Sequence, residues 1–256
     1  LTGKTPVTLS WDNGAGVVYE IEIGVDDYYL FTAHQRLRNN TDAPVAAHPW
    51  SRIRRDYKPV TSGYYILHEG PLGVLDGTLR EQSYDKAKSE SDKTKGASLE
   101  VQTKGGWAGI TDKYWLTALI PDQAVPVVGS FLHRTENNSD RYQVAFVQPE
   151  ATIVAPGTDA VTVARLFAGA KVVDLLDRYE RELGLPNFDK AVDFGWFYYI
   201  TKPIFYALDW LYRLTGNFGV AIMIFTVFAK AVFFPLASKS YRAMSKMKAL
   251  GPKMTE

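Results

Sequence analysis

A single lysine inside a long apolar run is the residue whose type and position most directly suggest chemistry. The run extends for twenty residues from Phe218 to Ala237, and Lys230 carries its only charge. At a rise of about 1.5 Å per residue, a helix of this length matches the roughly 30 Å hydrocarbon core of a bilayer, so we predict a transmembrane helix. A lysine near the centre of such a helix costs about 2.5–3.5 kcal/mol on insertion scales. We therefore expect Lys230 to face water, protein or a polar substrate.

Snorkelling of the lysine to the membrane surface is the alternative interpretation. Lys239 marks the predicted interface, about 13 Å further along the helix. A lysine stem spans only part of that distance, so the functional interpretation is favoured.

Basic residues gather behind the apolar run, although the whole chain is nearly neutral, with 29 Lys and Arg against 28 Asp and Glu. Five basic residues and one acidic residue follow Ser238, which gives that segment a net charge of +4 and leaves −3 for the rest. The positive-inside rule then predicts a cytoplasmic C-terminal end. It places residues 1 to about 215 on the outer face, which is the periplasm in a bacterium.

The chain contains no cysteine, which excludes disulfides and thiolate metal sites, and we expect no metal or other cofactor. It begins with Leu1, and no signal peptide precedes the globular part. Because an exported domain needs a targeting segment, we expect the chain to be a fragment of a longer protein.

Period-two alternation from Thr5 to about Ala168 predicts antiparallel β structure with one buried face. Strands are predicted at residues 19–25, 29–37, 64–68, 99–103, 114–120, 127–133, 141–147 and 160–167. Strands this closely spaced over about 165 residues favour a β-sandwich. The tryptophans of strand-like runs, Trp50, Trp107 and Trp115, are predicted core anchors.

Two helices are expected after the strands. The period changes to 3.6 near Gly169, and the apolar side chains of the next segment share one face of a helix that we expect to pack against the sandwich. A second amphipathic segment begins near Trp196, and its aromatic residues suit a helix lying in the headgroup region, with an ordinary core helix as the alternative. By contrast, the charged segment from Tyr84 to Ser98 has no apolar period, which predicts a mobile loop.

An ordered series of motifs in the last part of the chain resembles the YidC family of bacterial membrane protein insertases. The series comprises DFGW at 193–196, a proline-containing amphipathic helix, a Gly-Asn-Phe-Gly turn at 216–219, a span with one basic residue, Phe-Pro-Leu at 234–236 and SYRAMSKMKALGPK at 240–253. The upstream stretches DDYYLF, NNT and GGWAGITDKYWLTALIP are also similar. The resemblance therefore covers essentially the whole chain.

The resemblance implies a mainly β protein with a periplasmic β-supersandwich, followed by membrane helices that surround a polar groove. With the sequence patterns, it divides the chain into a supersandwich at 1–168, a helix and linker packing on it at 169–192, an amphipathic interfacial helix at 193–216, a transmembrane helix at 217–238 and the start of a basic cytoplasmic helical hairpin at 239–256. The implied function is insertion and folding of inner-membrane proteins, alone or with the Sec translocon, without covalent catalysis. The implied partners are nascent membrane proteins, the lipid bilayer, Sec translocon components and the ribosome.

The resemblance also implies roles for particular residues. Lys230 occupies the position of the family's groove cation, which is usually arginine. The positive charge is kept, but the planar guanidinium that bonds a carboxylate through two N–H groups is lost. Thr226, one turn earlier on the same face, adds a groove hydroxyl. The expected contacts of the cytoplasmic hairpin are Met244, Lys246, Met247 and Lys248. A thioether surface bordered by cations suits a nascent apolar helix or ribosomal RNA, and an amphipathic helix at an anionic membrane surface is the favoured alternative.

A membrane-anchored periplasmic domain that binds sugar or docks to a translocon partner is the alternative function, since supersandwich domains resemble sugar mutarotases. A catalytic version needs histidines and acidic residues that converge in a cleft. The candidates are His34, His48, His68 and His133.

Overall fold

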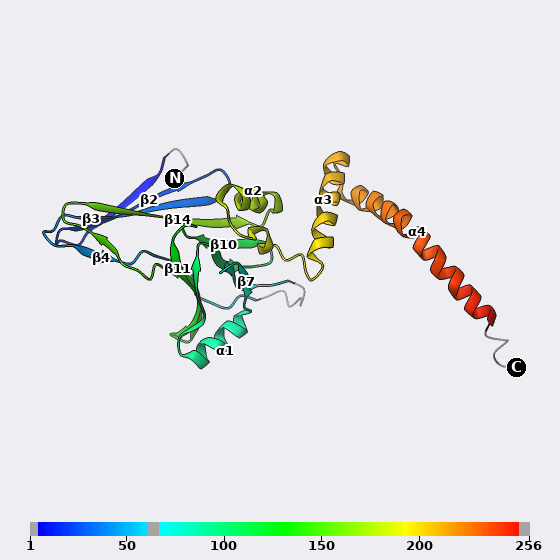
Figure 1. Ribbon diagram of the computed structural model, residues 1–256, viewed down its shortest axis with the longest axis horizontal. Coiled ribbons are helices and arrows are strands. Elements are labelled where there is room, and N and C mark those ends of the chain that lie inside the picture. Colours follow the sequence, from blue (N-terminus) through cyan, green and yellow to red (C-terminus); the bar gives the residue numbers. More distant parts are fainter. Residues whose placement is uncertain (1–4, 61–66, 251–256) are drawn as a thin grey trace. The chain divides into compact units, whose positions relative to one another are not determined.

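The chain forms two compact units, Leu1–Asp193 and Phe194–Glu256. The computed structural model describes residues 5–60 and 67–250, and for residues 245–250 it describes the backbone alone. The strand predicted at 64–68 therefore lies largely outside the described residues. The first unit holds the β structure, and the second holds two helices near the C-terminal end (Figure 1).

Antiparallel sheets make up most of the first unit, which confirms the mainly β, sandwich-like fold. An eight-stranded sheet has the order β1 (Val7–Asp12), β2 (Val17–Val25), β3 (Leu30–Asn39), β14 (Asp159–Ala170), β10 (Trp115–Ile120), β9 (Trp107–Thr111), β6 (Gly70–Leu75) and β7 (Thr78–Glu81). A four-stranded sheet has the order β5 (Trp50–Arg55), β12 (Ser139–Val147), β11 (Pro126–Glu136) and β8 (Ala97–Lys104). A short pair joins β13 (Thr152–Val154) to β4 (Val45–Ala47).

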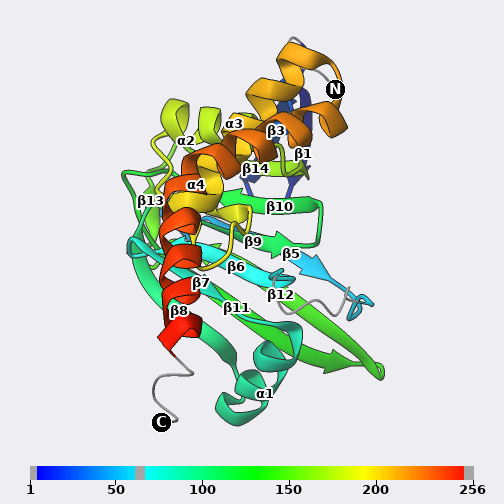
Figure 2. The ribbon, with the colours of Figure 1, turned by 90° about the vertical axis from the view of Figure 1, so that its right-hand side faces the viewer.

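Three layers enclose two main apolar cores. Between the two large sheets, Phe131 and Val144 of the smaller sheet pack with Leu75 of the larger one. On the other face of the larger sheet, α2 (Val173–Leu183) and the 3-10 helix η1 (Phe188–Ala191) cover a second core. Figure 2 shows β10, β9 and β6 above β12 and β11, with α1 (Tyr84–Thr94) beside the smaller sheet. This layering follows from the alternation of buried and exposed residues along β11.

The three tryptophans predicted as core anchors differ in their surroundings. Trp107 is fully buried, and its indole N–H donates to the carbonyl oxygen of Pro186 at 3.0 Å. Trp50 and Trp115 are 53% and 61% exposed, so the prediction is wrong for these two residues. A strand places successive side chains on opposite faces, and both lie on faces that no other layer covers fully.

The segment predicted as a mobile loop contains α1, so that prediction is wrong. Ser83 caps the helix by accepting a hydrogen bond from the backbone N–H of Lys86. Tyr84, Ala87 and Ser91 are buried against the smaller sheet. Their spacing is helical, but two of the three side chains are too small or too polar to give an apolar signal in the sequence.

The helix predicted near Gly169 is α2. Its Leu176 and Tyr179 belong to the core beneath the larger sheet, together with Phe167 of β14. Gly184 ends the helix at φ 64°, a left-handed conformation that glycine adopts without a steric penalty.

The second unit contains α3 (Tyr198–Thr215) and α4 (Phe218–Leu250), which contact each other. Gly216, at φ 67°, ends α3, and its N–H donates to the carbonyl oxygen of Tyr212. The Asn217 side-chain oxygen then accepts from the N–H groups of Gly219 and Val220, so one residue caps the start of α4. The Gly-Asn pair thus ends one helix and begins the next.

Candidate functional site

The apolar part of α4 is the one segment of the described chain whose length and composition suit a membrane span. It covers Phe218–Met244, a window of 18 residues within it has a mean hydropathy of 2.2, and almost none of that window is buried within the chain. Ala221 is its one fully buried residue. An exposed apolar surface of this length needs lipid or other protein around it.

Lys230 and Thr226 lie on the same face of α4, one turn apart, because four residues nearly complete a helical turn. Both residues are exposed in the described chain. The Thr226 hydroxyl donates to the carbonyl oxygen of Ile222 at 2.8 Å, which satisfies its donor and leaves its lone pairs available. Lys230 has no ionic or hydrogen-bonding partner among the described residues. Three ammonium donors are therefore available within a stretch of the helix, residues 218–237, that carries no other charge.

Pro235 leaves a backbone carbonyl group near this pair without its usual helical hydrogen bond. A proline inside a helix has no N–H to donate to the carbonyl four residues earlier, which is that of Ala231. That carbonyl is adjacent to Lys230 in the chain, and the i to i−4 ladder does not satisfy it. The sequence analysis missed this acceptor, although a proline within a predicted helix is a signal for it.

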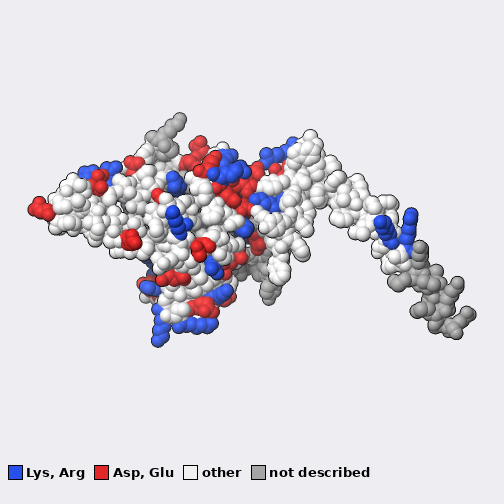
Figure 3. Space-filling model, viewed as in Figure 1, with Lys and Arg blue, Asp and Glu red and all other residues white. Residues whose placement is uncertain are grey.

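Basic side chains gather near the C-terminal end of this segment, as the blue atoms near the far end of α4 show (Figure 3). Lys239 and Arg242 are exposed there, and Met244 is 47% exposed. The side chains of Lys246, Met247 and Lys248 lie outside the described residues. Of the four predicted contact residues of the hairpin, Met244 is the one whose side chain the structure describes, and the contact itself stays a prediction.

Helix α3 presents aromatic side chains without burying any residue. Tyr199 is 89% exposed, and Trp210 is also exposed. The Phe194 ring contacts the rings of Tyr198 and Phe205, and the Lys202 ammonium lies 5.5 Å from the centroid of the Tyr198 ring. Rings with polar tips beside a cation have the chemistry of a membrane–water interface.

The four histidines of the alternative function have separate surroundings. His133 is buried, and its Nε2 lies 2.8 Å from Oδ1 of Asp140, which also accepts a hydrogen bond from Lys88. His48 lies beside the carbonyl of Gln148, and His68 lies beside the carbonyl of Pro71. His34 is exposed on β3. These positions do not form the convergent cleft that a histidine-dependent catalyst needs.

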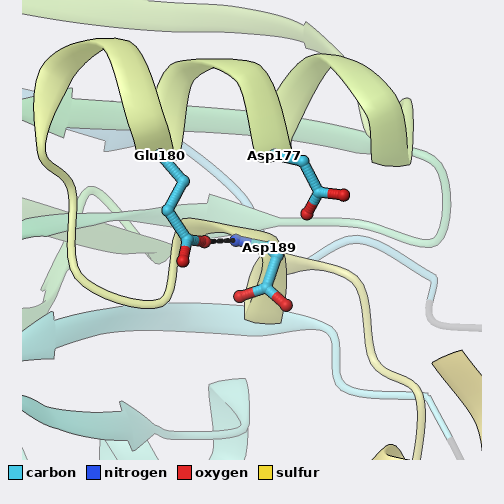
Figure 4. Close-up of side chains that lie close together, drawn as sticks. All are labelled: Asp177, Glu180 and Asp189. Carbon is cyan, nitrogen blue, oxygen red and sulfur yellow. Dashed lines mark hydrogen bonds between the residues drawn. The ribbon is translucent and has the colours of Figure 1, made fainter.

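Three acidic side chains, Asp177, Glu180 and Asp189, lie close together between α2 and η1 (Figure 4). A carboxylate oxygen of Glu180 accepts a hydrogen bond from the backbone N–H of Asp189 at 3.0 Å. This contact holds η1 against α2, so the proximity of the carboxylates has a structural cause.

Two family models match successive parts of this chain, one over its β unit and the first part of α3 and one over the C-terminal part. A family model described as the YidC periplasmic domain matches residues 1–207, and one described as 60Kd inner membrane protein matches residues 210–256. The membrane protein insertase YidC of Granulibacter bethesdensis is 56% identical over 254 residues, which cover 99% of this chain and 44% of the relative. The corresponding proteins of Acidiphilium cryptum and Rickettsia bellii are 47% and 46% identical, with the same coverage of 99% and 44%.

The chain spans less than half the length of these relatives. Among solved structures, a galactose mutarotase related enzyme from Lactobacillus acidophilus is 7% identical, with a TM-score of 0.43 over 64% of this chain and 68% of that chain. That likeness is too low to support an argument about function. The two family models and the identities to the curated relatives confirm the resemblance seen in the sequence: this chain belongs to the YidC family of inner-membrane proteins.

Proposed function

We propose that this chain is part of a membrane protein insertase of the bacterial inner membrane, in which α4 forms the charged wall of a hydrated groove. The observation that carries the proposal is the unpartnered ammonium of Lys230 on an exposed apolar helix. Thr226 and the carbonyl of Ala231 lie near it and extend the polar surface. The relatives that match the whole chain are named membrane protein insertases.

The proposed orientation follows from charge. Residues 1 to about 215 lie in the periplasm, and the basic segment after the span lies in the cytoplasm, as the positive-inside rule requires. The exposed rings of α3 then lie at the periplasmic interface, where Trp and Tyr are favoured.

The proposed mechanism requires no covalent step. Burial of an apolar substrate segment in lipid is favourable by about 25 cal/mol per Å², whereas moving its polar flank through hydrocarbon is costly. A hydrated groove lowers the cost for the flank while the apolar segment leaves sideways into lipid. The Lys230 ammonium attracts acidic groups of that flank, because opposite charges in a wet groove with low-dielectric walls interact more strongly than in bulk water.

The proposed partners have matching chemistry. Nascent membrane proteins supply the apolar segments, and the lipid bilayer receives them. The Sec translocon is a proposed partner in insertion, and the ribosome is a proposed partner at the basic cytoplasmic segment, where Arg242 is described.

Charge reversal at Lys230 tests the proposal. We expect Lys230→Glu, in a full-length protein that carries this sequence, to impair insertion of a substrate with an acidic translocated segment by about tenfold or more, since attraction becomes repulsion. Lys230→Arg should insert that substrate normally. Protease protection in cells depleted of their own insertase measures the inserted fraction.

A neutral version of the same substrate is the matched control, and it should depend less on residue 230. Phe233→Glu adds a carboxylate elsewhere in the span and controls for disturbance of the helix. Normal insertion of the acidic substrate by Lys230→Glu would show that the positive charge has no role.

A further inference from the structure

One end of the larger sheet carries exposed aromatic residues that the proposed function does not use. The turn between β9 and β10 holds Tyr114, and β10 begins with Trp115; these residues are 64% and 61% exposed. The turn between β2 and β3 holds Tyr28 and Tyr29, which are exposed as well. Both turns therefore present aromatic rings at the surface of the described chain.

The register of the strands places both turns at the same end of the sheet. Thr111, the last residue of β9, is paired with Gly70, the first residue of β6. Trp115 is paired with Ala170, the last residue of β14, and β3 begins beside the same end of β14. In the sheet order, β9 and β10 each have a described neighbour on both sides. The position of the β9–β10 turn is thus set by strands inside the sheet and not by an edge.

The chain also leaves the β unit at this end. The carboxylate of Asp193, the last residue of the first unit, accepts a hydrogen bond from the backbone N–H of His68, two residues before β6. The Lys171 ammonium, directly after β14, donates to the Thr111 hydroxyl at 3.0 Å. Burial lowers the pKa of this ammonium, and the nearby carboxylate of Asp193 opposes that shift. Helix α3 begins at Tyr198, and the five residues from Asp193 to it span at most about 18 Å.

The turns at the opposite end of the larger sheet differ in composition. They lie at residues 13–16, 76–77, 105–106, 121–125 and 155–158. They consist of glycine, proline and small or uncharged polar residues with two aspartates, and these five turns contain no aromatic and no basic residue. Among these turns of the sheet, aromatic residues therefore occur at the end from which the chain continues to α3.

Basic side chains lie beside the aromatic rings. The Lys113 ammonium is 5.0 Å from the centroid of the Tyr114 ring, and the Arg178 guanidinium is 4.7 Å from that of Tyr28. Val172, at the same end of β14, is exposed too. Tyr and Trp rings have an apolar body and a polar tip, so they favour the headgroup region of a bilayer, and basic side chains are favoured there as well.

Acidic residues of the two turns show that rings, more than net charge, supply the attraction. Asp26 accepts a hydrogen bond from the Tyr179 hydroxyl, and Asp112 accepts two from the Arg55 guanidinium. Asp27 is exposed in the β2–β3 turn and repels anionic lipid. A vesicle of zwitterionic lipid is therefore the suitable membrane for a test.

From these features we infer that this end of the β unit contacts the lipid headgroup region, with Tyr114 and Trp115 as the main contacts. The inference rests on the proposed function, in which α3 lies at the periplasmic interface. A connection of at most about 18 Å between Asp193 and α3 keeps the β9–β10 turn near that interface. The contact fixes which end of the sandwich faces the membrane.

Quenching by a nitroxide on the lipid headgroup tests the contact. The chain has no cysteine, so Lys113→Cys, Tyr199→Cys and Ala155→Cys, in a full-length protein freed of other cysteines, each carry one bimane fluorophore. The labelled protein is reconstituted in phosphatidylcholine vesicles with or without the nitroxide in both leaflets. We expect the nitroxide to lower the emission at Lys113 and Tyr199 at least about twofold, because both labels lie in the headgroup region. The Ala155 label, beyond the far end of the 12-residue strand β14 and about 36 Å away, should keep its emission.

Removal of the rings is the matching change in the protein. Tyr114→Ser combined with Trp115→Ser keeps the two backbone carbonyls, which accept from the N–H groups of Lys171 and Asp112. We expect quenching of the Lys113 label to fall at least about twofold in this variant, because the rings hold the turn in the headgroup region. Trp50→Ser, at an exposed tryptophan of the smaller sheet, is the matched control and should leave the quenching unchanged. The thermal unfolding transition shows that the variants are folded.

Iodide in the aqueous phase identifies the results that overturn the inference. Quenching at Lys113 by iodide and not by the nitroxide would place the turn in water. Quenching by neither reagent would mean that protein covers the turn. Full nitroxide quenching in the double serine variant would show that the rings have no role.

The label at Tyr199 separates this inference from the proposed function. Nitroxide quenching at Tyr199 with none at Lys113 refutes the contact of the β unit alone. No quenching at Tyr199 refutes the interfacial position of α3 on which the inference rests.

Discussion

The two units of this chain treat apolar side chains in opposite ways. In the first unit, large side chains such as Phe131 and Trp107 are fully buried between layers. In the second, α3 buries no residue, and the rings of Phe228 and Phe233 on α4 are each 63% exposed. Aromatic side chains therefore form a buried core in the first unit and an exposed surface in the second. The first unit carries its own core, and the second requires a surrounding apolar phase.

Charged side chains also differ between the units, because those of the first unit include a well-formed ion pair and Lys230 in the second unit has none in the part of the chain that the structure describes. In the first unit the Arg55 guanidinium makes two hydrogen bonds to the Asp112 carboxylate, at 2.6 and 2.7 Å, and this bonding raises the pKa of Arg55. Lys230 in the second unit has no such partner among the described residues. The charge of Arg55 is satisfied within the fold, whereas the charge of Lys230 can interact with groups outside the described chain.

The same substitution in each unit gives the largest expected contrast. Phe131→Ala should lower the free energy of unfolding of the β unit by about 3–5 kcal/mol, because it leaves a cavity between the sheets. Phe233→Ala should leave the unfolding transition of the β unit within about 0.5 kcal/mol of its original value. Urea unfolding of the chain in detergent, followed by the near-ultraviolet dichroism of the buried aromatic residues, measures both. Equal losses would contradict the division into a self-supporting core and a lipid-dependent unit.

Acid unfolding tests the role of a paired charge in the first unit, and its expected change in the free energy of unfolding is smaller than that of Phe131→Ala. Hydrogen bonds from Lys88 and then from His133 lower the pKa of Asp140. A carboxylate whose folded pKa is depressed stabilises the fold above its unfolded pKa of about 3.9 and loses that contribution as the pH falls through the folded pKa.

We therefore expect Asp140→Asn to cost about 1–3 kcal/mol at neutral pH and to flatten the fall in stability below about pH 4. Thermal unfolding from pH 7 to pH 2 measures this. Asp42→Asn, at an exposed turn, is the control and should leave the curve unchanged. An unaltered acid limb in Asp140→Asn would show that this carboxylate does not contribute to the acid sensitivity.

Sequence periodicity located much of the fold because many strands have one buried face. The predicted strands at 127–133 and 141–147 lie within β11 and β12, and in β11 buried residues alternate with partly buried ones. Helix α1 was missed because its buried face consists of Tyr84, Ala87 and Ser91, which carry little apolar signal. Arg55 and Asp112 lie 57 positions apart in the chain, and no local pattern reveals a contact between them.

The shared face of Thr226 and Lys230 could be predicted because its geometry is local, although their roles stay a prediction. Lys230 comes four positions after Thr226, so helical periodicity alone places them on one face. The Ala231 carbonyl, which Pro235 cannot bond, is equally local, because a proline within a predicted helix identifies it. Trp50 and Trp115 were misplaced because a strand pattern shows that faces alternate without showing which face another layer covers.

The central claim is that Lys230 lies in water within the membrane, and its accessibility tests this most directly. The chain has no cysteine, so Lys230→Cys and Phe233→Cys in a full-length protein each carry a single thiol within this sequence. Reaction with a charged maleimide requires the thiolate and therefore water. In membrane vesicles we expect Lys230→Cys to react and Phe233→Cys to remain unlabelled. A Lys230→Cys protein as unreactive as Phe233→Cys would contradict the account.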